Sequence, residues 1–324
     1  MIQRAAQRLR LLASRWIRGT APIILMYHRV ADLAIDPWGL AVRPARFEEQ
    51  IDTLTRSRRV VHLHELLKAE ECRSSRDKPL AAVTFDDGYH DVYTNARGIL
   101  RLYDCPMTLF VTTGAIGATH EFWWDAISRI FLETELLPPS ITFSTAGKTC
   151  HWSVPPFDES SGREKIFYEI WADLRRMPYD AQMRHVEELG RWAGCDLTAR
   201  QSHRAMTREE VRNISDGLVV IGAHTVTHPT LPAHLYETQY YEIAESRRVC
   251  EELIGSPVNA FAYPFGDRDD ATVSAVRQAG FALACTVDAG VVRPGTDPIR
   301  LPRIYVGDWN GDEFQKRLAE DPLL

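Results

Sequence analysis

The amino-acid sequence predicts an α/β protein built on a parallel sheet or barrel. Short apolar runs typical of strands alternate with amphipathic runs typical of helices, before residue 117 and again after residue 204. Several apolar runs end in acidic or imidazole side chains, and α/β proteins bind ligands at the carboxyl ends of their strands. The 324 residues suffice for one large α/β domain with an insertion, or for two smaller domains.

The expected elements lie on both sides of the break in the alternation. Strands are predicted at residues 22–30, 81–88, 106–112, 218–223, 259–263, 282–287 and 303–306. Helices are predicted at residues 44–57, 63–70, 92–103, 207–216, 235–254, 271–279 and 313–319. Thr207 and Glu210 form a capping-box pattern at the start of one helix. We therefore assign residues 21–116 and 205–312 to one domain and residues 313–324 to a C-terminal helix.

Residues 117–204 are predicted to form an insertion or lid on this domain. The segment contains two helical runs (163–177 and 180–192), a proline-rich patch (Pro138, Pro139, Pro155 and Pro156) and five of the eight tryptophans. These tryptophans are Trp123, Trp124, Trp152, Trp171 and Trp192. Large aromatic side chains of this kind either form the core of the insertion or stack on a sugar or partner surface.

The composition limits the classes of partner and compartment. With 45% hydrophobic and 25% charged residues the chain is typical of globular proteins, and a net charge of −6 gives no argument for nucleic-acid binding. The six cysteines are scattered and include no CxxC pair, so we expect reduced thiols and neither a zinc knuckle nor a disulfide framework.

Residues 1–20 are predicted to form a basic amphipathic helix. They contain five arginines and no acid, with apolar residues at helical spacing, which is typical of contact with an anionic membrane surface through residues 2–18. A helix packed on the domain, or a frayed terminus, is the alternative. Because arginines interrupt the apolar core of a secretory signal and no run is long enough to span a bilayer, we expect a cytoplasmic protein at the inner membrane surface.

Three strand ends carry the residues suited to chemistry. Asp86 and Asp87 follow an apolar strand, and two adjacent carboxylates need a partner such as a divalent cation. His224 and His228 follow another strand, and their i, i+4 spacing places both imidazoles on one face of a helical turn. Two histidines and one aspartate form the open three-ligand site of a catalytic metal, although such a pair standing alone is often two surface or capping histidines.

A third strand runs into the turn formed by residues 263–266, with the sequence Tyr-Pro-Phe-Gly. The proline fixes the backbone and the glycine permits close approach. The main-chain N–H of Phe265 is therefore a candidate donor to an oxyanion in the cleft.

These three motifs, TFDDG, HTVTH and YPFG in this order, resemble those of the polysaccharide deacetylases (carbohydrate esterase family 4, the NodB-homology domain). The resemblance runs from about Ile23 to Val306, except for the insertion. It implies an irregular (β/α)7 barrel, similar to a TIM barrel, that removes N- or O-acyl groups from carbohydrates with a divalent metal. Zn²⁺ is the metal that it favours, with Co²⁺, Mn²⁺ or Ni²⁺ as alternatives.

The resemblance also implies roles for individual residues. Asp87, His224 and His228 would bind the metal, while Asp86 would be the general base that activates water. This division is physically reasonable because a cation keeps its own ligand ionised and leaves the neighbouring carboxylate free to take a proton. The oxyanion would lie between the metal and the N–H of Phe265.

The sequence departs from the family pattern at two positions. Ala262 stands where many members have an arginine that orients the catalytic aspartate, and Arg300 or Arg303 is our candidate replacement. No histidine lies beyond His234 to protonate the leaving amine as in many members. His28 is our substitute, because some exopolysaccharide deacetylases resemble this N-terminal pattern; a structural hydrogen-bonding role is its alternative.

We therefore predict a metal-dependent carbohydrate N-deacetylase, a hydrolase acting on carbon–nitrogen bonds other than peptide bonds. Its expected substrate is an N-acetylated sugar or oligosaccharide, in particular an exopolysaccharide or lipid-linked glycan precursor. A non-haem iron oxygenase uses the same two-histidine, one-carboxylate ligand set, but has no need of the extra carboxylate of Asp86. A non-catalytic carbohydrate-binding relic is the third alternative, because the family's arginine and C-terminal histidine are missing.

Overall fold

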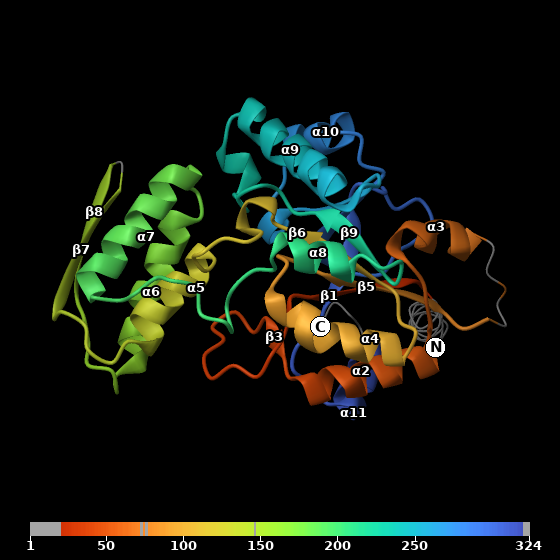
Figure 1. Ribbon diagram of the computed structural model, residues 1–324, viewed down its shortest axis with the longest axis horizontal. Coiled ribbons are helices and arrows are strands. Elements are labelled where there is room, and N and C mark those ends of the chain that lie inside the picture. The colour runs from red at the N-terminus through yellow and green to blue at the C-terminus, as the bar shows by residue number, and fades with distance from the viewer. Residues whose placement is uncertain (1–20, 72–73, 75–76, 146, 320–324) are drawn as a thin grey trace, which may run out of the picture.

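The computed structural model describes residues 21–71, 74, 77–145 and 147–319, and within them the parallel strands close into a seven-stranded barrel (Figure 1). Each strand pairs with the next, and β5 pairs back with β1 from Ile23↔Ala81 to Tyr27↔Phe85, which completes the ring. In barrel order the strands are β1 (Ile23–Tyr27), β12 (Leu301–Tyr305), β11 (Leu283–Ala289), β10 (Ala260–Ala262), β9 (Val219–Ala223), β6 (Met107–Val111) and β5 (Leu80–Phe85). The expected (β/α)7 barrel is confirmed.

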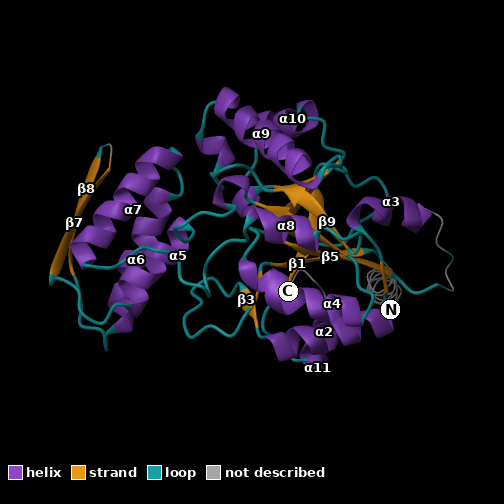
Figure 2. Ribbon diagram, in the orientation of Figure 1, coloured by secondary structure: helices purple, strands orange, loops and turns teal. Residues whose placement is uncertain are grey.

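Helices surround the barrel, as Figure 2 shows. They are α2 (Pro44–Ser57), α3 (Leu63–Glu71), a π-helical turn (Val92–Ala96) continued by α4 (Arg97–Leu102), α8 (Arg208–Ile214), α9 (Tyr236–Ile254), α10 (Asp270–Gln278) and α11 (Gly311–Ala319). Short strands complete the domain: β4 (Arg59–Val60) pairs with β5, and β2 (Arg29–Val30) pairs with β3 (Ala41–Val42). The predicted capping box of α8 forms, with Glu210 N–H donating to Thr207 Oγ1.

The alternation of side chains along each strand separates two apolar layers. On β5, Ala81, Val83 and Phe85 pack in the layer between the barrel and its helices. Ala82 instead belongs to the cluster inside the barrel, together with Phe110 and Ala262. By the same alternation Thr84 and Asp86 face the barrel interior, which places a carboxylate at the interior end of this strand.

The segment between residues 117 and 204 has its own apolar core and lies beside the barrel (Figure 1). Its elements are α5 (Trp123–Ser128), a π-helical turn (Arg129–Glu133), β7 (Ser140–Thr145), β8 (Lys148–Ser153), α6 (Ser160–Leu174) and α7 (Tyr179–Ala193). Its core joins α5 to α6 and α7 through side chains such as Ile127, Phe167 and Val186. The antiparallel hairpin β7–β8 was not expected from the sequence.

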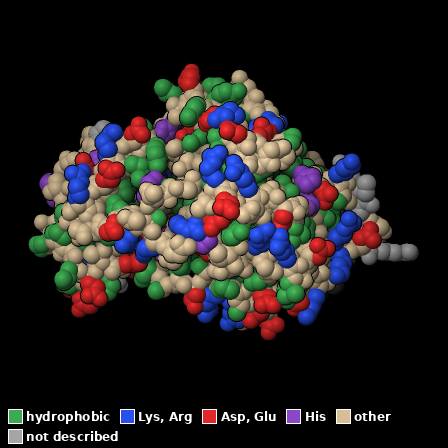
Figure 3. Space-filling view, viewed as in Figure 1, with side chains coloured by type: hydrophobic (Ala, Val, Ile, Leu, Met, Phe, Trp, Pro, Cys, Tyr) green, Lys and Arg blue, Asp and Glu red, His purple; other side chains and the backbone are tan. Residues whose placement is uncertain are grey.

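The structure tests the expectations about the cysteines and about membrane-spanning segments for the described residues only. The cysteines in the described residues, from Cys105 to Cys285, are free thiols, while Cys72 and the predicted helix of residues 1–20 lie outside the described residues. No helix in the described part of the chain combines the length and the apolarity that crossing a membrane requires. Basic and acidic side chains are interspersed over the face in Figure 3.

Candidate active site

The first motif leaves β5 in a conformation that places two buried aspartates at the barrel mouth. Asp87 has a φ of +73° and Gly88 a φ of +89°, so the chain turns sharply directly after the strand. A Cβ atom on Gly88 would lie 3.1 Å from Val111 Cγ1, in addition to the strain of the left-handed backbone. As a result, Asp86 points to the barrel interior and Asp87 to the neighbouring histidines.

Arg303 on β12 pairs with Asp86 inside the barrel. Its Nη1 and Nη2 donate to Asp86 Oδ1 and Oδ2, both at 2.7 Å, and its Nε donates to the Thr286 carbonyl at 2.8 Å. Burial raises the pKa of Asp86, but the charge and hydrogen bonds of Arg303 outweigh burial and hold that pKa below its usual value. Asp86 is therefore ionised, fixed in orientation and almost inaccessible to bulk solvent, at 2% exposure.

The structure decides between the two arginines that the sequence left open. Arg300 pairs with the exposed Asp270 at 2.7 Å, away from the site. Arg303 has a fully buried side chain and contacts Asp86 directly.

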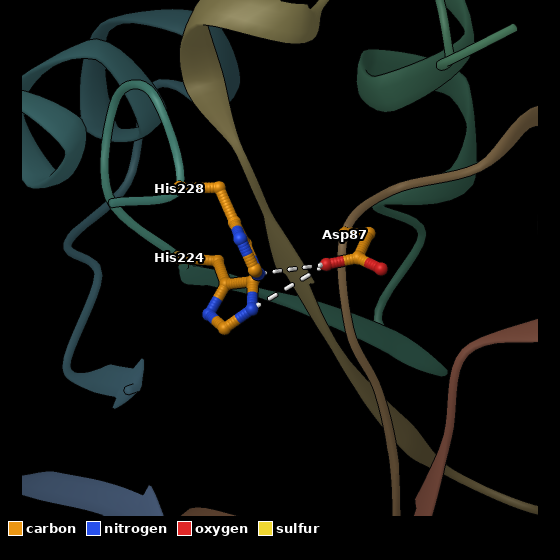
Figure 4. A group of neighbouring side chains, drawn as sticks. All are labelled: Asp87, His224 and His228. Carbon is orange, nitrogen blue, oxygen red and sulfur yellow. Dashed lines mark ion pairs between the residues drawn. The ribbon is translucent and has the colours of Figure 1, made fainter. Parts of the chain in front are cut away.

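Asp87, His224 and His228 converge from two loops, as Figure 4 shows. Asp87 Oδ1 lies 3.5 Å from His224 Nε2 and 3.4 Å from His228 Nε2. All three side chains are buried, and one donor atom from each lies within 4.8 Å of the others.

The donor atoms of these three residues fit a divalent cation. His224 Nδ1 donates to the Ala262 carbonyl at 2.7 Å, so Nε2 is the ring atom that faces Asp87. Burial lowers the pKa of His224, but its contact with Asp87 and the charges of Asp86 and Asp87 outweigh burial and raise that pKa. Asp87 Oδ1 is buried and has no hydrogen-bond donor among the described residues. Burial, and then the charge of His224, lowers the pKa of His228 to about 3, which keeps this ring neutral as a ligand must be. A divalent cation bound by Asp87 Oδ1 and the two Nε2 atoms would satisfy all three donor atoms.

The loop that carries the two histidines corrects our expectation of a helical turn. Residues 224–228 are irregular, and Thr225 and His228 have positive φ values of 64° and 59°. The irregular backbone is held by Glu242 on α9, which accepts from the N–H groups of Val226 and Thr227, both at 2.8 Å. A buried carboxylate replaces the intrahelical hydrogen bonds, so the imidazoles meet through a loop.

The third motif places an aromatic ring beside the histidines. Phe265 has a φ of +56°, and its ring lies 4.5 Å from that of His228. Gly266 follows with a φ of +74°, where a Cβ atom would clash with Val287. The proposed use of the Phe265 N–H as an oxyanion donor stays a prediction.

Backbone strain is concentrated in these motifs. Five non-glycine residues in the described chain have positive φ, and four of them are Asp87, Thr225, His228 and Phe265. Such conformations are uncommon for side-chain-bearing residues and cluster where a site is held in a fixed geometry.

His28 lies at the end of β1, with Nε2 4.0 Å from Asp86 Oδ2. Its ring lines the same cavity, and its Nδ1 is buried without a partner among the described residues. Burial lowers its pKa and outweighs the opposite effect of Asp87 and Asp86. The structure thus brings His28 to the site, while its role as an acid stays a prediction.

The cavity over these residues has a volume of about 330 Å³, and the insertion forms part of its wall. Trp124, Trp171 and Arg175 contribute from the insertion, opposite Trp38 and Leu40 from the loop after β2. Trp124 packs on His228 at 4.7 Å, and its Nε1 donates to Tyr89 Oη. The tryptophan content marked this segment, but nothing in the sequence distinguished the cavity residues from the core residues.

Comparisons with known proteins agree with this arrangement. The family model described as polysaccharide deacetylase matches residues 73–134 and 190–284, which contain all three motifs. The Bacillus subtilis protein YxkH, whose name refers to the same family, is 22% identical over 101 residues, which span 31% of this chain and 36% of YxkH. The match therefore covers about a third of that relative.

Solved structures show the same fold over nearly the whole chain. The Streptococcus pyogenes deacetylase PplD, in complex with acetate, is 18% identical with a TM-score of 0.59, covering 92% of this chain and 98% of PplD. IcaB from Ammonifex degensii is 20% identical, also with a TM-score of 0.59, covering 94% and 98%. With its motifs in order on a closed barrel, the chain is similar to the polysaccharide deacetylases in sequence over residues 73–134 and 190–284 and in fold over nearly its whole length.

Proposed function

We propose that this protein is a metal-dependent hydrolase that removes an N-acetyl group, or another acyl group, from a carbohydrate. The observation that carries the proposal is the pairing of Asp86 with Arg303 beside the triad of Asp87, His224 and His228. Asp87 has the surroundings of a metal ligand. Its neighbour Asp86 stays ionised but does not belong to the group of Asp87, His224 and His228. Hydrolysis requires such a second carboxylate as a base, whereas the oxygenase alternative does not.

A cation held by Asp87, His224 and His228, most suitably Zn²⁺, would lower the pKa of a water molecule and polarise the acyl oxygen. Asp86 is positioned to take the proton, and Arg303 fixes the direction of both carboxylate oxygens. His28 Nε2, at 4.0 Å from Asp86 Oδ2, is positioned to pass a proton to the leaving nitrogen. The backbone N–H of Phe265 is our candidate donor to the developing oxyanion.

Acetate is the product that we expect, and PplD was solved with acetate bound. The substrate that we favour is an N-acetylated sugar in an exopolysaccharide or lipid-linked glycan precursor, met at the inner membrane surface. A formyl group on an amino sugar would use the same residues.

The test is the release of acetate and formate from N-acylated sugars and oligosaccharides, before and after chelation. We expect release to stop with chelator and to return with Zn²⁺ or Co²⁺. Release that continues at full rate after the metal content has been shown to be zero would contradict the proposal. The Asp86→Asn variant is the matched control, because it should bind metal and release nothing.

A further inference from the structure

Helix α6 of the insertion and the residue after it contribute Trp171 and Arg175 to the wall of the active-site cavity. Tyr168 and Trp171 belong to α6, and Arg175 is the residue directly after it. Their i, i+3 and i+7 spacing places the three side chains along one face. Tyr168 and Trp171 contact the loop between β2 and β3, while Arg175 contacts the loops that follow β9 and β10. The contacts at the two ends of this face therefore join α6 to separate loops of the barrel domain, and residues near both sets of contacts, Trp38 and Phe265, line the cavity.

The first end is joined to the loop between β2 and β3. Tyr168 Oη donates to the Pro37 carbonyl at 3.0 Å. The ring of Trp38 lies 5.1 Å from that of Tyr168 and 4.5 Å from that of Trp171. Trp38 and Trp171 both line the cavity, so their contact forms a continuous part of its wall.

The other end is joined to the loops that carry the second and third motifs. Arg175 Nε donates to Thr230 Oγ1 at 3.2 Å, and its Nη2 pairs with Asp267. The guanidinium also lies over the rings of Phe265, at 4.6 Å, and Trp171, at 4.8 Å. Because Asp267 balances its charge, Arg175 serves here as a connection between the insertion and the barrel.

From these contacts we propose that α6 limits the site to one sugar residue at the end of a glycan or on a carrier, and excludes internal residues of a polymer. The inference rests on the proposed deacylase function and names its substrate class. A polymer bound through an internal residue needs a groove that is open at two ends. Here the two ends of the α6 face, Tyr168 and Arg175, both contact the barrel domain. The cavity of about 330 Å³ is also near the lower end of the roughly 300–1,000 Å³ of ligand pockets.

The aromatic wall agrees with a sugar occupant. Trp124, Trp171 and Phe265 present apolar ring surface to the cavity, while Asp86, Asp87 and the histidines present polar atoms at its base. This division suits a pyranose, which has apolar C–H faces and polar edges. The acyl-bearing nitrogen would lie toward the aspartates.

The experiment uses the metal-loaded full chain and N-acetylglucosamine oligomers from monomer to hexamer, labelled at the reducing end. Mass spectrometry after partial turnover identifies which residue has lost its acetyl group. We expect loss from a terminal residue only, with similar kcat/KM for every oligomer. Loss from internal residues of the hexamer, at a rate comparable to terminal loss, would overturn the inference.

Variants test whether α6 is the cause of the expected specificity for terminal residues. Trp171→Ala combined with Arg175→Met removes the contacts at both sides, and we expect at least a tenfold rise in the ratio of internal to terminal deacetylation. Trp192→Phe is the matched control, because Trp192 lies in the insertion and donates to Ser140 instead of lining the cavity. An unchanged ratio in a correctly folded double variant would show that α6 does not set the specificity.

Binding measurements distinguish a failure of this inference from a failure of the proposed function. If no oligomer loses acetate, the deacetylase proposal fails for these sugars, while titration calorimetry still tests the cavity. We expect the monomer and hexamer to bind to Asp86→Asn within about threefold of one another. A hexamer that binds more than tenfold more tightly would indicate several subsites and overturn the one-residue inference.

Discussion

The pairing of Arg303 with Asp86 leads to a prediction in which two destabilising changes compensate each other. Arg303→Met preserves much of the side-chain length but removes the two 2.7 Å hydrogen bonds to Asp86 and the bond to Thr286. Asp86 then stays buried without its counter-charge, a situation that costs about 3–5 kcal/mol of unfolding free energy. Asp86→Asn should likewise destabilise the fold, because it leaves the guanidinium without its counter-charge.

The double variant Asp86→Asn/Arg303→Met should be more stable than the less stable single variant, since it leaves neither charge unpaired. Urea unfolding at pH 7 measures all four proteins. A double-variant loss equal to the sum of the single losses would refute the reasoning, because it would mean that the two groups act independently.

The same cycle applies to turnover. Without Arg303, burial raises the pKa of Asp86, and a protonated Asp86 cannot act as a base. We expect kcat for acetate release to fall by about 10²–10⁴, the usual contribution of general-base catalysis. In the Asp86→Asn background, Arg303→Met should change kcat little further. An equally large additional loss in that background would show that Arg303 acts on substrate directly.

Four further predictions concern single residues. Asp86→Asn should abolish deacylation and keep one metal per chain, so metal loss on elemental analysis would mean that Asp86 is a ligand. His28→Ala should lower kcat more than it raises KM; an unchanged kcat would remove His28 as the acid. Glu242→Ala should weaken Zn²⁺ binding by about 10–100-fold in calorimetry, since Glu242 holds the loop of both histidine ligands, and an unaltered affinity would contradict that role. Glu210 has a pKa lowered to about 2: burial raises it, but hydrogen bonds from Arg204 and Thr207 outweigh burial. Its stabilising contribution is therefore full above pH 4.5 and is lost as the pH falls toward 2. Glu210→Gln, which retains a capping side chain, should cost about 1 kcal/mol at pH 7 in urea unfolding and progressively less below pH 4.5; a constant difference would exclude the titration.

The strands of the barrel and the ends that carry chemistry were predictable because each is a local pattern. An apolar run followed by Asp86 and Asp87, or by His224, indicates a strand end without knowledge of distant residues. The helical turn expected at residues 224–228 was wrong for a non-local reason. Spacing alone favours a helix there, but the loop is stabilised by Glu242, which lies on a separate helix.

The walls of the cavity could not be predicted from the sequence. Trp124 and Trp171 line the cavity, while Trp192 donates to Ser140 beside the hairpin, although all three belong to one tryptophan-rich segment. Their positions depend on how the insertion packs on the loop of Trp38 and on Phe265, and these contacts join residues far apart in the chain. Periodicity identifies the helix but not its neighbours.

The arginine that contacts Asp86 comes from a different strand than the family motif predicts. Ala262 and Arg303 both face the barrel interior, on β10 and β12, and the small side chains of Ala82 and Ala262 leave space there. Closure of the barrel brings β12 next to β1, and β1 next to β5, so a guanidinium on β12 can reach Asp86. In this structure the buried, bidentate positive charge at Asp86 comes from β12 and not from β10. The alanine at position 262 is therefore no argument that this chain has lost its catalytic function, because Arg303 supplies the same charge to the same carboxylate from another strand.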